Sequence, residues 1–235
     1  MDEVTARPGK VVAIDGPAAS GKSTTAAAVA GGLGFVHLNS GLLYRAFTWR
    51  TLSEGWEPGG AEYDDRVRSV HIELEPGDVG LRVLIDGEDP GEDLLGQDVA
   101  AGVSAVAGVG TVRAAVLAIL RGAGEQFDLV CDGRDIGTTV FPTADLKIFL
   151  VADVRERARR RLLDLEVIPG DGEVEEEAAR LARRDAADAN RELSPLRRAP
   201  DAVEIDTTSL APEQVVDAIL ELAAARGMSG PGSAA

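Results

Sequence analysis

Cysteine and lysine are scarce in this sequence of 235 residues, and positive charge is in short supply overall. The single cysteine, Cys131, cannot form a disulfide within the chain, so we expect a reducing, cytoplasmic location. Lysine occurs only as Lys10, Lys22 and Lys147, which leaves few candidates for a site that needs an ammonium group. The net charge of −16 argues against nucleic acid or an anionic membrane as the main partner.

Long apolar runs are also missing. The first residues, MDEVTARPGKVV, contain no apolar core before a cleavage site, and we expect no signal peptide. The most apolar stretch, residues 99–120, is rich in glycine and alanine and is interrupted by Arg113. It falls short of the roughly 20 apolar residues that span a bilayer, so it predicts a helix pair of a soluble protein.

Five short apolar runs alternate with segments that are compatible with helices. The runs are residues 10–15, 34–38, 127–131, 146–151 and 202–206. This alternation predicts an α/β fold with a central five-stranded parallel sheet and helices on both faces.

Three segments depart from this alternation. Between residues 64 and 97, VHIELEPGD and GLRVLIDGED flank a Pro/Gly turn, which predicts a small inserted antiparallel hairpin. Residues 168–178 are acidic and interrupted by glycine and proline, which predicts an exposed, mobile connection. The tail, residues 223–235, ends in GMSGPGSAA and is predicted to be disordered.

The stretch GPAASGKST matches the phosphate-binding pattern G-x-x-x-x-G-K-S. Its glycines let consecutive N–H groups point at one anion, while Lys22, expected at the loop surface, would reach the β- and γ-phosphates. The Ser23 hydroxyl would bind Mg²⁺. A glycine-rich turn that matches by chance is the alternative, although KVVAIDG before the loop is typical of a buried strand. The loop residues expected to bind ATP are Gly16, Pro17, Ala18, Ala19, Ser20, Gly21, Lys22, Ser23 and Thr24.

A second candidate anion site follows the next predicted strand, in NSGLLYRAF. Ser40, Tyr44 and Arg45 are polar or charged among apolar neighbours, and Arg45 would project from the first turns of a helix. These residues predict a phosphate site that faces the first one. The alternative is a capped helix with an exposed arginine.

Charged residues also end the predicted strand in FDLVCDGRDIGTTVF. Ligands of open parallel sheets bind beyond the carboxyl ends of the strands. Asp132 is therefore a candidate for binding Mg²⁺ or its waters, and Arg134 can bind a phosphate through two donors. A tight turn closed by the Arg134–Asp135 pair is the alternative.

A third motif, RRDAADANRELSP, places charges on one helical face. Arg184, Asp188 and Arg191 are spaced four and three residues apart, so their side chains are neighbours on a helix. They are candidates for binding a substrate, and the alternative is a surface ion-pair ladder.

Together these motifs resemble those of the cytidylate kinases, the bacterial CMP/dCMP kinases among the nucleoside monophosphate kinases. The resemblance runs from about Val11 to Leu222 and includes IDGPAASGKST, NSGLLYR, CDGRDIGTTVFP, KIFLVADVRERARRR, RDAADANR and DAVEIDTT in the family's order. It implies a P-loop kinase that transfers the γ-phosphoryl group of ATP to CMP or dCMP with Mg²⁺.

The resemblance also implies roles for single residues and regions. The candidate catalytic residues are Lys22, Arg134, Arg157 and Arg160. Lys22 would serve the donor phosphates, Arg134 together with Arg45 the acceptor phosphate, and the lid arginines the phosphoryl group in transfer. The core kinase domain would comprise residues 10–39 and 99–222 with a mobile helical lid at about 157–190, and residues 40–98 would form the acceptor region. Asn39 departs from the family, which commonly has aspartate there. Residues that match the acceptor pocket are Ser40, Arg45, Ser104, Arg113, Arg134, Asp135, Arg184, Asp188 and Arg191.

Transfer to a monophosphate needs no strong general base, because the attacking oxygen is already ionised. Selectivity for cytosine would follow if the Asp135 carboxylate accepts from the exocyclic amine. The alternatives are a kinase of another small acceptor, such as UMP or a shikimate-like alcohol, a P-loop regulatory switch, and a subunit of a larger assembly. A switch would need a guanine-binding N-K-x-D motif, which the sequence lacks. We expect a monomer with small-molecule partners.

Overall fold

The computed structural model describes residues 9–77, 80–228 and 230, and the chain divides into two compact units. Unit 1 comprises Met1–Lys10 and Val36–Leu129, and unit 2 comprises Val11–Phe35 and Val130–Ala235. Residues 99–129 are expected from the sequence to belong to the core kinase domain, whereas in the structure they cluster with unit 1. That functional division stays a prediction.

The fold is α/β, as predicted. Among the described residues the main sheet has five strands in the order β2-β5-β1-β6-β7, and β3 and β4 form a second, antiparallel sheet. Each predicted run is a strand within one or two residues of its expected bounds. The strands are β1 (Val11–Asp15), β2 (Val36–Asn39), β5 (Leu129–Gly133), β6 (Leu146–Val151) and β7 (Val203–Asp206).

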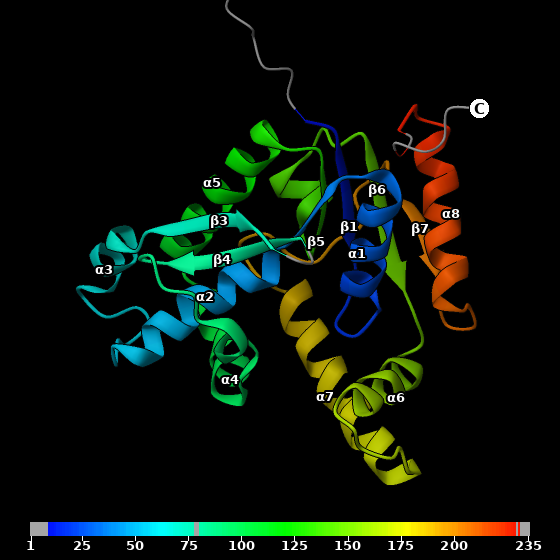
Figure 1. Ribbon diagram of the computed structural model, residues 1–235. Coiled ribbons are helices and arrows are strands. Elements are labelled where there is room, and N and C mark those ends of the chain that lie inside the picture. The colour runs from blue at the N-terminus through cyan, green and yellow to red at the C-terminus, as the bar shows by residue number, and fades with distance from the viewer. Residues whose placement is uncertain (1–8, 78–79, 229, 231–235) are drawn as a thin grey trace, which may run out of the picture. The chain divides into compact units, whose positions relative to one another are not determined.

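In unit 2, two helices cover one face of the strands. α1 (Lys22–Leu33) and α8 (Pro212–Ala224) pack together beside β1 and β6, which pair in parallel (Figure 1). Because side chains alternate along a strand, Val12 and Ile14 of β1 point to the same face. Both are fully buried in one apolar cluster with residues of α1 and α8. This packing anchors the strand that leads into the phosphate-binding loop.

Two more helices of unit 2, α6 (Val154–Asp164) and α7 (Asp171–Ala189), pack against each other (Figure 1). The predicted exposed, mobile connection at residues 168–178 is wrong from residue 171 onward, because α7 begins there. Val174 and Ala178 are buried in a cluster with α6 residues. Glutamate has a good helix propensity, so the acidic run extends the helix instead of interrupting it.

The predicted disordered tail is wrong at its start. α8 continues to Ala224, and Ala223 and Met228 are buried in the same cluster as α1. Residue 229 and residues 231–235 lie outside the described residues. So do residues 1–8, on which the expectation of no signal peptide mainly rests.

Unit 1 contains the predicted hairpin. β3 (Ile72–Pro76) pairs with β4 (Leu81–Ile85) in an antiparallel register. A helix that the sequence analysis did not predict, α3 (Tyr63–Ser69), precedes the hairpin. It has aspartates in its first turn and arginines in its last turn, which suits the helix dipole.

The other elements of unit 1 are helical. α2 (Ser40–Ser53) contacts α4 (Gln97–Val106), α5 (Gly110–Gln126) and the 3₁₀ helix η1 (Gly91–Leu95). The Asn39 side chain accepts from the Gly41 N–H at 2.8 Å. Asparagine therefore caps the N-terminus of α2.

The predicted helix pair at residues 99–120 corresponds to α4 and α5. Within the described parts of the chain, no single helix has the length and apolar character to cross a membrane. α4 and α5 meet these criteria only when taken together, and they are bent by 102° at the break between them.

Candidate active site

The loop between β1 and α1 has a backbone that explains its glycines. A Cβ on Gly16 would lie 2.3 Å from the Leu150 carbonyl oxygen, so no larger residue is accommodated there. Gly21 precedes α1 in the left-handed conformation, with a φ of 82°. Ala19 has a φ of 56° although it carries a Cβ. Such a conformation costs on the order of 1–3 kcal/mol and persists only where neighbouring contacts hold it.

Lys22 is the first residue of α1 and is buried, with 7% exposure, so the expectation that it lies at the loop surface is wrong. Its Nζ donates to the Pro17 carbonyl oxygen at 2.9 Å. Burial, followed by the charge of Arg134, holds the pKa of Lys22 well below its ordinary value, and Arg184 adds to this effect. A phosphate among these three cations would be attracted by each of them and would stabilise the charged lysine.

Oxygen ligands for a cation lie beside this lysine. The Ser23 hydroxyl donates to Oδ2 of Asp132, a buried residue of β5, at 2.6 Å. Mg²⁺ usually takes one or two protein oxygens together with phosphate oxygens and waters. The Ser20 hydroxyl is buried and has no hydrogen-bond partner among the described residues, so it is available to a phosphate oxygen. These groups fit Mg²⁺ bound to a nucleotide phosphate.

Asp15, at the end of β1, connects the phosphate-binding loop to residues 132–137. Its two carboxylate oxygens accept from the N–H groups of Ile136 and Gly137, each at 2.8 Å. Both residues belong to η2 (Ile136–Val140), a short π-helical turn. Burial raises the pKa of Asp15 to about 6, although both amide hydrogen bonds oppose this shift. The segment that carries Arg134 is therefore bound directly to the strand that enters the loop.

α7 contacts this segment through part of the predicted helical face. Arg184 and Asp188 lie on α7, but Arg191 follows its end at Ala189, so the prediction that all three share one helical face is wrong for Arg191. The Asp188 side chain is 4% exposed, accepts from Nε of Arg134 at 2.9 Å and pairs with Arg191. Asp188 is therefore buried and does not belong to a surface ion-pair ladder. Arg184 is exposed, and its charge acts on Lys22. Unit 2 thus brings the lysine of the loop, the arginine of the DGRD motif and this face of α7 into one charged group.

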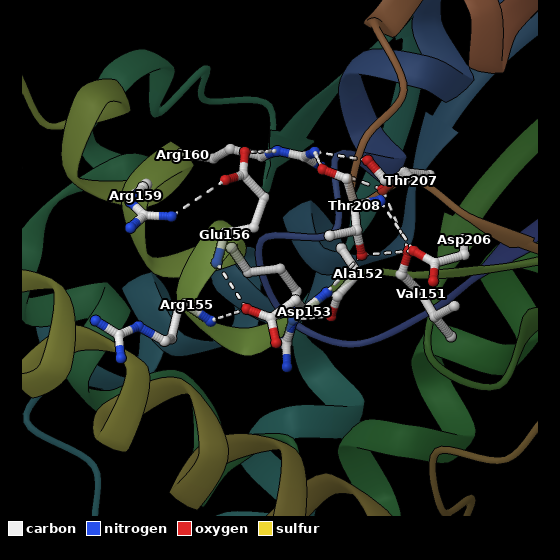
Figure 2. Close-up of polar contacts among 11 residues, drawn as sticks. Val151, Ala152, Asp153, Arg155, Glu156, Arg159, Arg160, Asp206, Thr207 and Thr208 are labelled. Carbon is white, nitrogen blue, oxygen red and sulfur yellow. Dashed lines mark hydrogen bonds and ion pairs between the residues drawn. The ribbon is translucent and has the colours of Figure 1, made fainter.

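The two α6 arginines predicted to be catalytic have different partners. Figure 2 shows Arg160 at the turn after β7, where it donates to the Thr207 carbonyl oxygen at 2.7 Å and to the Thr207 hydroxyl at 3.1 Å. Arg157 is buried and donates to the Ala18 carbonyl oxygen at 2.8 Å and to Asp185 at 2.6 Å. Arg157 therefore lies on the phosphate-binding loop, whereas Arg160 lies at the β7 turn. Their action on the transferred phosphoryl group stays a prediction.

Unit 1 contains the other predicted acceptor residues. Ser40 is buried at the start of α2. The Arg113 guanidinium, from α5, lies 5.4 Å from the centre of the Tyr44 ring, close enough for a cation–π interaction. Arg45 donates to a carbonyl oxygen of η1 at 2.8 Å, and Ser104 is exposed on α4.

Two residues of unit 2 that contact the site, Asp15 and Asp185, were not predicted from the sequence. A carboxylate at the end of the apolar run VVAID signals a buried charge that needs partners, so Asp15 could have been found. Asp185 accepts from the Ala18 N–H at 3.0 Å, across 167 residues of sequence. Residue spacing contains no signal for a contact of that kind.

Comparison with known proteins identifies a family whose sequences this chain resembles. A family model described as cytidylate kinase matches residues 12–225. The chain is 44% identical over 216 residues to the cytidylate kinase of Geobacillus kaustophilus (strain HTA426), with coverage of 90% of this chain and 95% of that protein.

It is also 44% identical over 218 residues to a bifunctional pantoate ligase/cytidylate kinase of Synechococcus sp. (strain CC9311), with coverage of 90% of this chain. The chain spans only 44% of that bifunctional relative. Among solved structures, the crystal structure of TT1252 from Thermus thermophilus has a TM-score of 0.46 at 16% identity, over 93% of this chain and 98% of that chain. That likeness is too weak to interpret.

Proposed function

Since this chain belongs to the cytidylate kinase family, we propose that it transfers the γ-phosphoryl group of ATP to CMP or dCMP and releases ADP with CDP or dCDP. The observation that carries the proposal is the contact of Asp15, at the end of β1, with the N–H groups of Ile136 and Gly137, because it binds the DGRD segment to the strand that enters the phosphate-binding loop. The charge of Arg134 also lowers the pKa of Lys22, which supports a site that contains both cations. Phosphoryl transfer needs such a concentration of positive charge.

In the proposed reaction an ionised oxygen of the CMP phosphate attacks the γ-phosphorus of ATP. The bond from this phosphorus to the β,γ-bridging oxygen breaks, and ADP leaves with the electron pair. No proton has to be removed from the attacking oxygen, so the protein's task is to align two anions and neutralise charge. We assign the donor phosphates to Lys22 and the loop N–H groups, and the acceptor phosphate to Arg134.

Mg²⁺ is part of this proposal. Ser23 and Asp132 would hold the ion or its waters, and the ion would neutralise charge on the ATP phosphates. The contact between the Ser23 hydroxyl and Asp132 supports this assignment, because it brings both oxygen ligands to the lysine of the loop.

Recognition of the acceptor is assigned to residues of each unit. Asp135 is 6% exposed, and a buried carboxylate can accept from the exocyclic amine of cytosine. UMP presents a carbonyl at that position and would lose this hydrogen bond to the carboxylate, at a cost of about 1–3 kcal/mol. The proposed acceptor residues are Arg134, Asp135, Arg184, Asp188 and Arg191 of unit 2, and Ser40, Tyr44, Arg45, Ser104 and Arg113 of unit 1.

A coupled assay of ADP formation tests the proposal with CMP, dCMP, UMP, AMP and shikimate as acceptors. We expect kcat/KM for CMP and dCMP to exceed that for UMP by about tenfold or more, as the penalty above implies. ATP hydrolysis without an acceptor is the control. A preference for UMP, AMP or shikimate would refute the proposed acceptor. We also propose a monomer, which the mass of the native protein in solution tests.

A further inference from the structure

Ala18 of the phosphate-binding loop is held by the helices α6 and α7 through its side chain. Ala18 is 4% exposed and belongs to a small apolar cluster apart from the cluster around the sheet. The other buried members of the small cluster all come from α6 and α7, namely Ala158, Leu162, Val174, Ala178 and Leu181. The loop is thus packed into the helix pair at this residue.

The backbone of Ala18 is also bound on both sides. Its N–H donates to Oδ1 of Asp185 at 3.0 Å, and its carbonyl oxygen accepts from Nη1 of Arg157 at 2.8 Å. The same Arg157 nitrogen lies 2.6 Å from Oδ2 of Asp185. Asp185 of α7, Arg157 of α6 and Ala18 of the loop therefore each contact the other two. The side chains of Asp185 and Arg157 are 17% and 8% exposed, so water screens this ion pair only weakly.

The peptide unit between Pro17 and Ala18 links this arrangement to the phosphate-binding lysine. Its N–H is the one that Asp185 accepts from, and its carbonyl oxygen accepts from Nζ of Lys22 at 2.9 Å. A peptide unit is planar, so its orientation sets both groups together. The next residue, Ala19, is in the left-handed conformation that only surrounding contacts can maintain.

We infer that Asp185 is a positioning residue for ATP: through the Pro17–Ala18 peptide it holds the phosphate-binding loop and Lys22 in the geometry that binds the donor phosphates. This inference rests on the proposed function, because it assigns the loop to ATP. Asp185 contacts no reacting group in this scheme. It acts through a peptide unit, and Arg157 supports its carboxylate from α6.

The test compares Asp185→Ala and Asp185→Asn with the wild type. Alanine removes the acceptor of the Ala18 N–H and the ion pair, whereas asparagine keeps one oxygen for the N–H and loses the charge that Arg157 faces. The matched control is Glu175→Ala, because Glu175 also joins α7 to α6 through an ion pair, with Arg155 at 2.8 Å, but does not contact the loop. ATP binding is measured by calorimetry without any acceptor, beside KM for ATP, KM for CMP and Tm.

We expect Asp185→Ala to weaken ATP binding and raise KM for ATP by about tenfold, the size of one lost charge-assisted hydrogen bond. Asp185→Asn should weaken ATP binding and raise KM for ATP by about threefold, because asparagine keeps an oxygen for the Ala18 N–H. KM for CMP should change less than KM for ATP in both variants, and Glu175→Ala should bind ATP as the wild type does. If alanine does not fold, the nearly isosteric asparagine variant decides the test.

ATP binding within twofold of wild type in the folded Asp185 variants would overturn the inference, as would an equal loss in Glu175→Ala. Turnover of CMP by the wild type is measured separately. A wild type that binds ATP but does not phosphorylate CMP would refute the proposed acceptor while the binding comparison still decides the role of Asp185. Normal CMP turnover together with unchanged ATP binding in both variants would refute the positioning role alone.

Discussion

Replacement of Asp15 by asparagine should change how the stability of this protein depends on pH. The carboxylate is 4% exposed and accepts from the N–H groups of Ile136 and Gly137 at 2.8 Å. Burial raises the pKa of Asp15 from its ordinary value of 3.8 to about 6. In the native state the side chain therefore binds its proton more tightly than in the unfolded chain.

The sign of the effect follows from proton linkage. A raised native pKa stabilises the fold fully below pH 3.8, and this contribution is lost as the pH rises through 6. With these two pKa values the contribution is about 1.4 kcal/mol at pH 5 and about 0.1 kcal/mol at pH 7. Asparagine does not titrate, so the free energy of unfolding of the wild type relative to Asp15→Asn should fall by about 1.3 kcal/mol between pH 5 and pH 7.

Urea unfolding at both pH values measures this difference for the wild type and Asp15→Asn. Asp145→Asn is the control, because Asp145 also accepts from an N–H of β1, that of Val11 at 2.8 Å, but is exposed. This control measures what replacing an exposed carboxylate that accepts from β1 does to stability at each pH. A wild type that gains stability relative to Asp15→Asn as the pH rises would refute the reasoning, and so would a constant difference.

Three further substitutions test the proposed site. Lys22→Met, which keeps much of the buried stem, should lower kcat by far more than tenfold with little change in Tm; retention of more than about a tenth of kcat would contradict its role. Asp135→Asn should raise KM for CMP more than KM for ATP, whereas an equal loss for both nucleotides would move Asp135 out of base recognition. Asp188→Ala should raise KM for CMP and lower stability by about 3 kcal/mol or more, because Arg134 and Arg191 lose a buried partner. It should also alter the ratio of kcat/KM for CMP and dCMP if Asp188 accepts from the 2′-hydroxyl, and an unchanged ratio would exclude that contact.

Elements with strong local signals could be predicted from the sequence. Each of the five strands is a run of apolar residues with turn or helix signals on either side, and each lies within two residues of its predicted position. The phosphate-binding loop was recognisable because its glycines are required by local backbone geometry, as at Gly21. Arg184 and Asp188 were recognisable as neighbours on one helical face from their spacing, whereas the extension of that face to Arg191 is wrong because α7 ends at Ala189.

Burial and long-range contacts were decided only by the tertiary structure. Residues 168–178 looked like a loop because acidic residues and glycine are common in loops, but Val174 and Ala178 have apolar partners on α6, and the helix forms. Lys22 was expected at the surface, yet the packing around the loop buries it beside Arg134.

The contact of Asp185 with Ala18 is the clearest example of a feature that only the tertiary structure decides. By itself the sequence determined the fold class, the loop and the charged face of α7, because spacing and composition act between near neighbours along the chain. Which of the two carboxylates on that helix, Asp185 or Asp188, accepts from the N–H of Ala18 depends on the packing of α7 against the loop. That packing joins residues far apart in sequence, and only the folded chain brings them within hydrogen-bond distance.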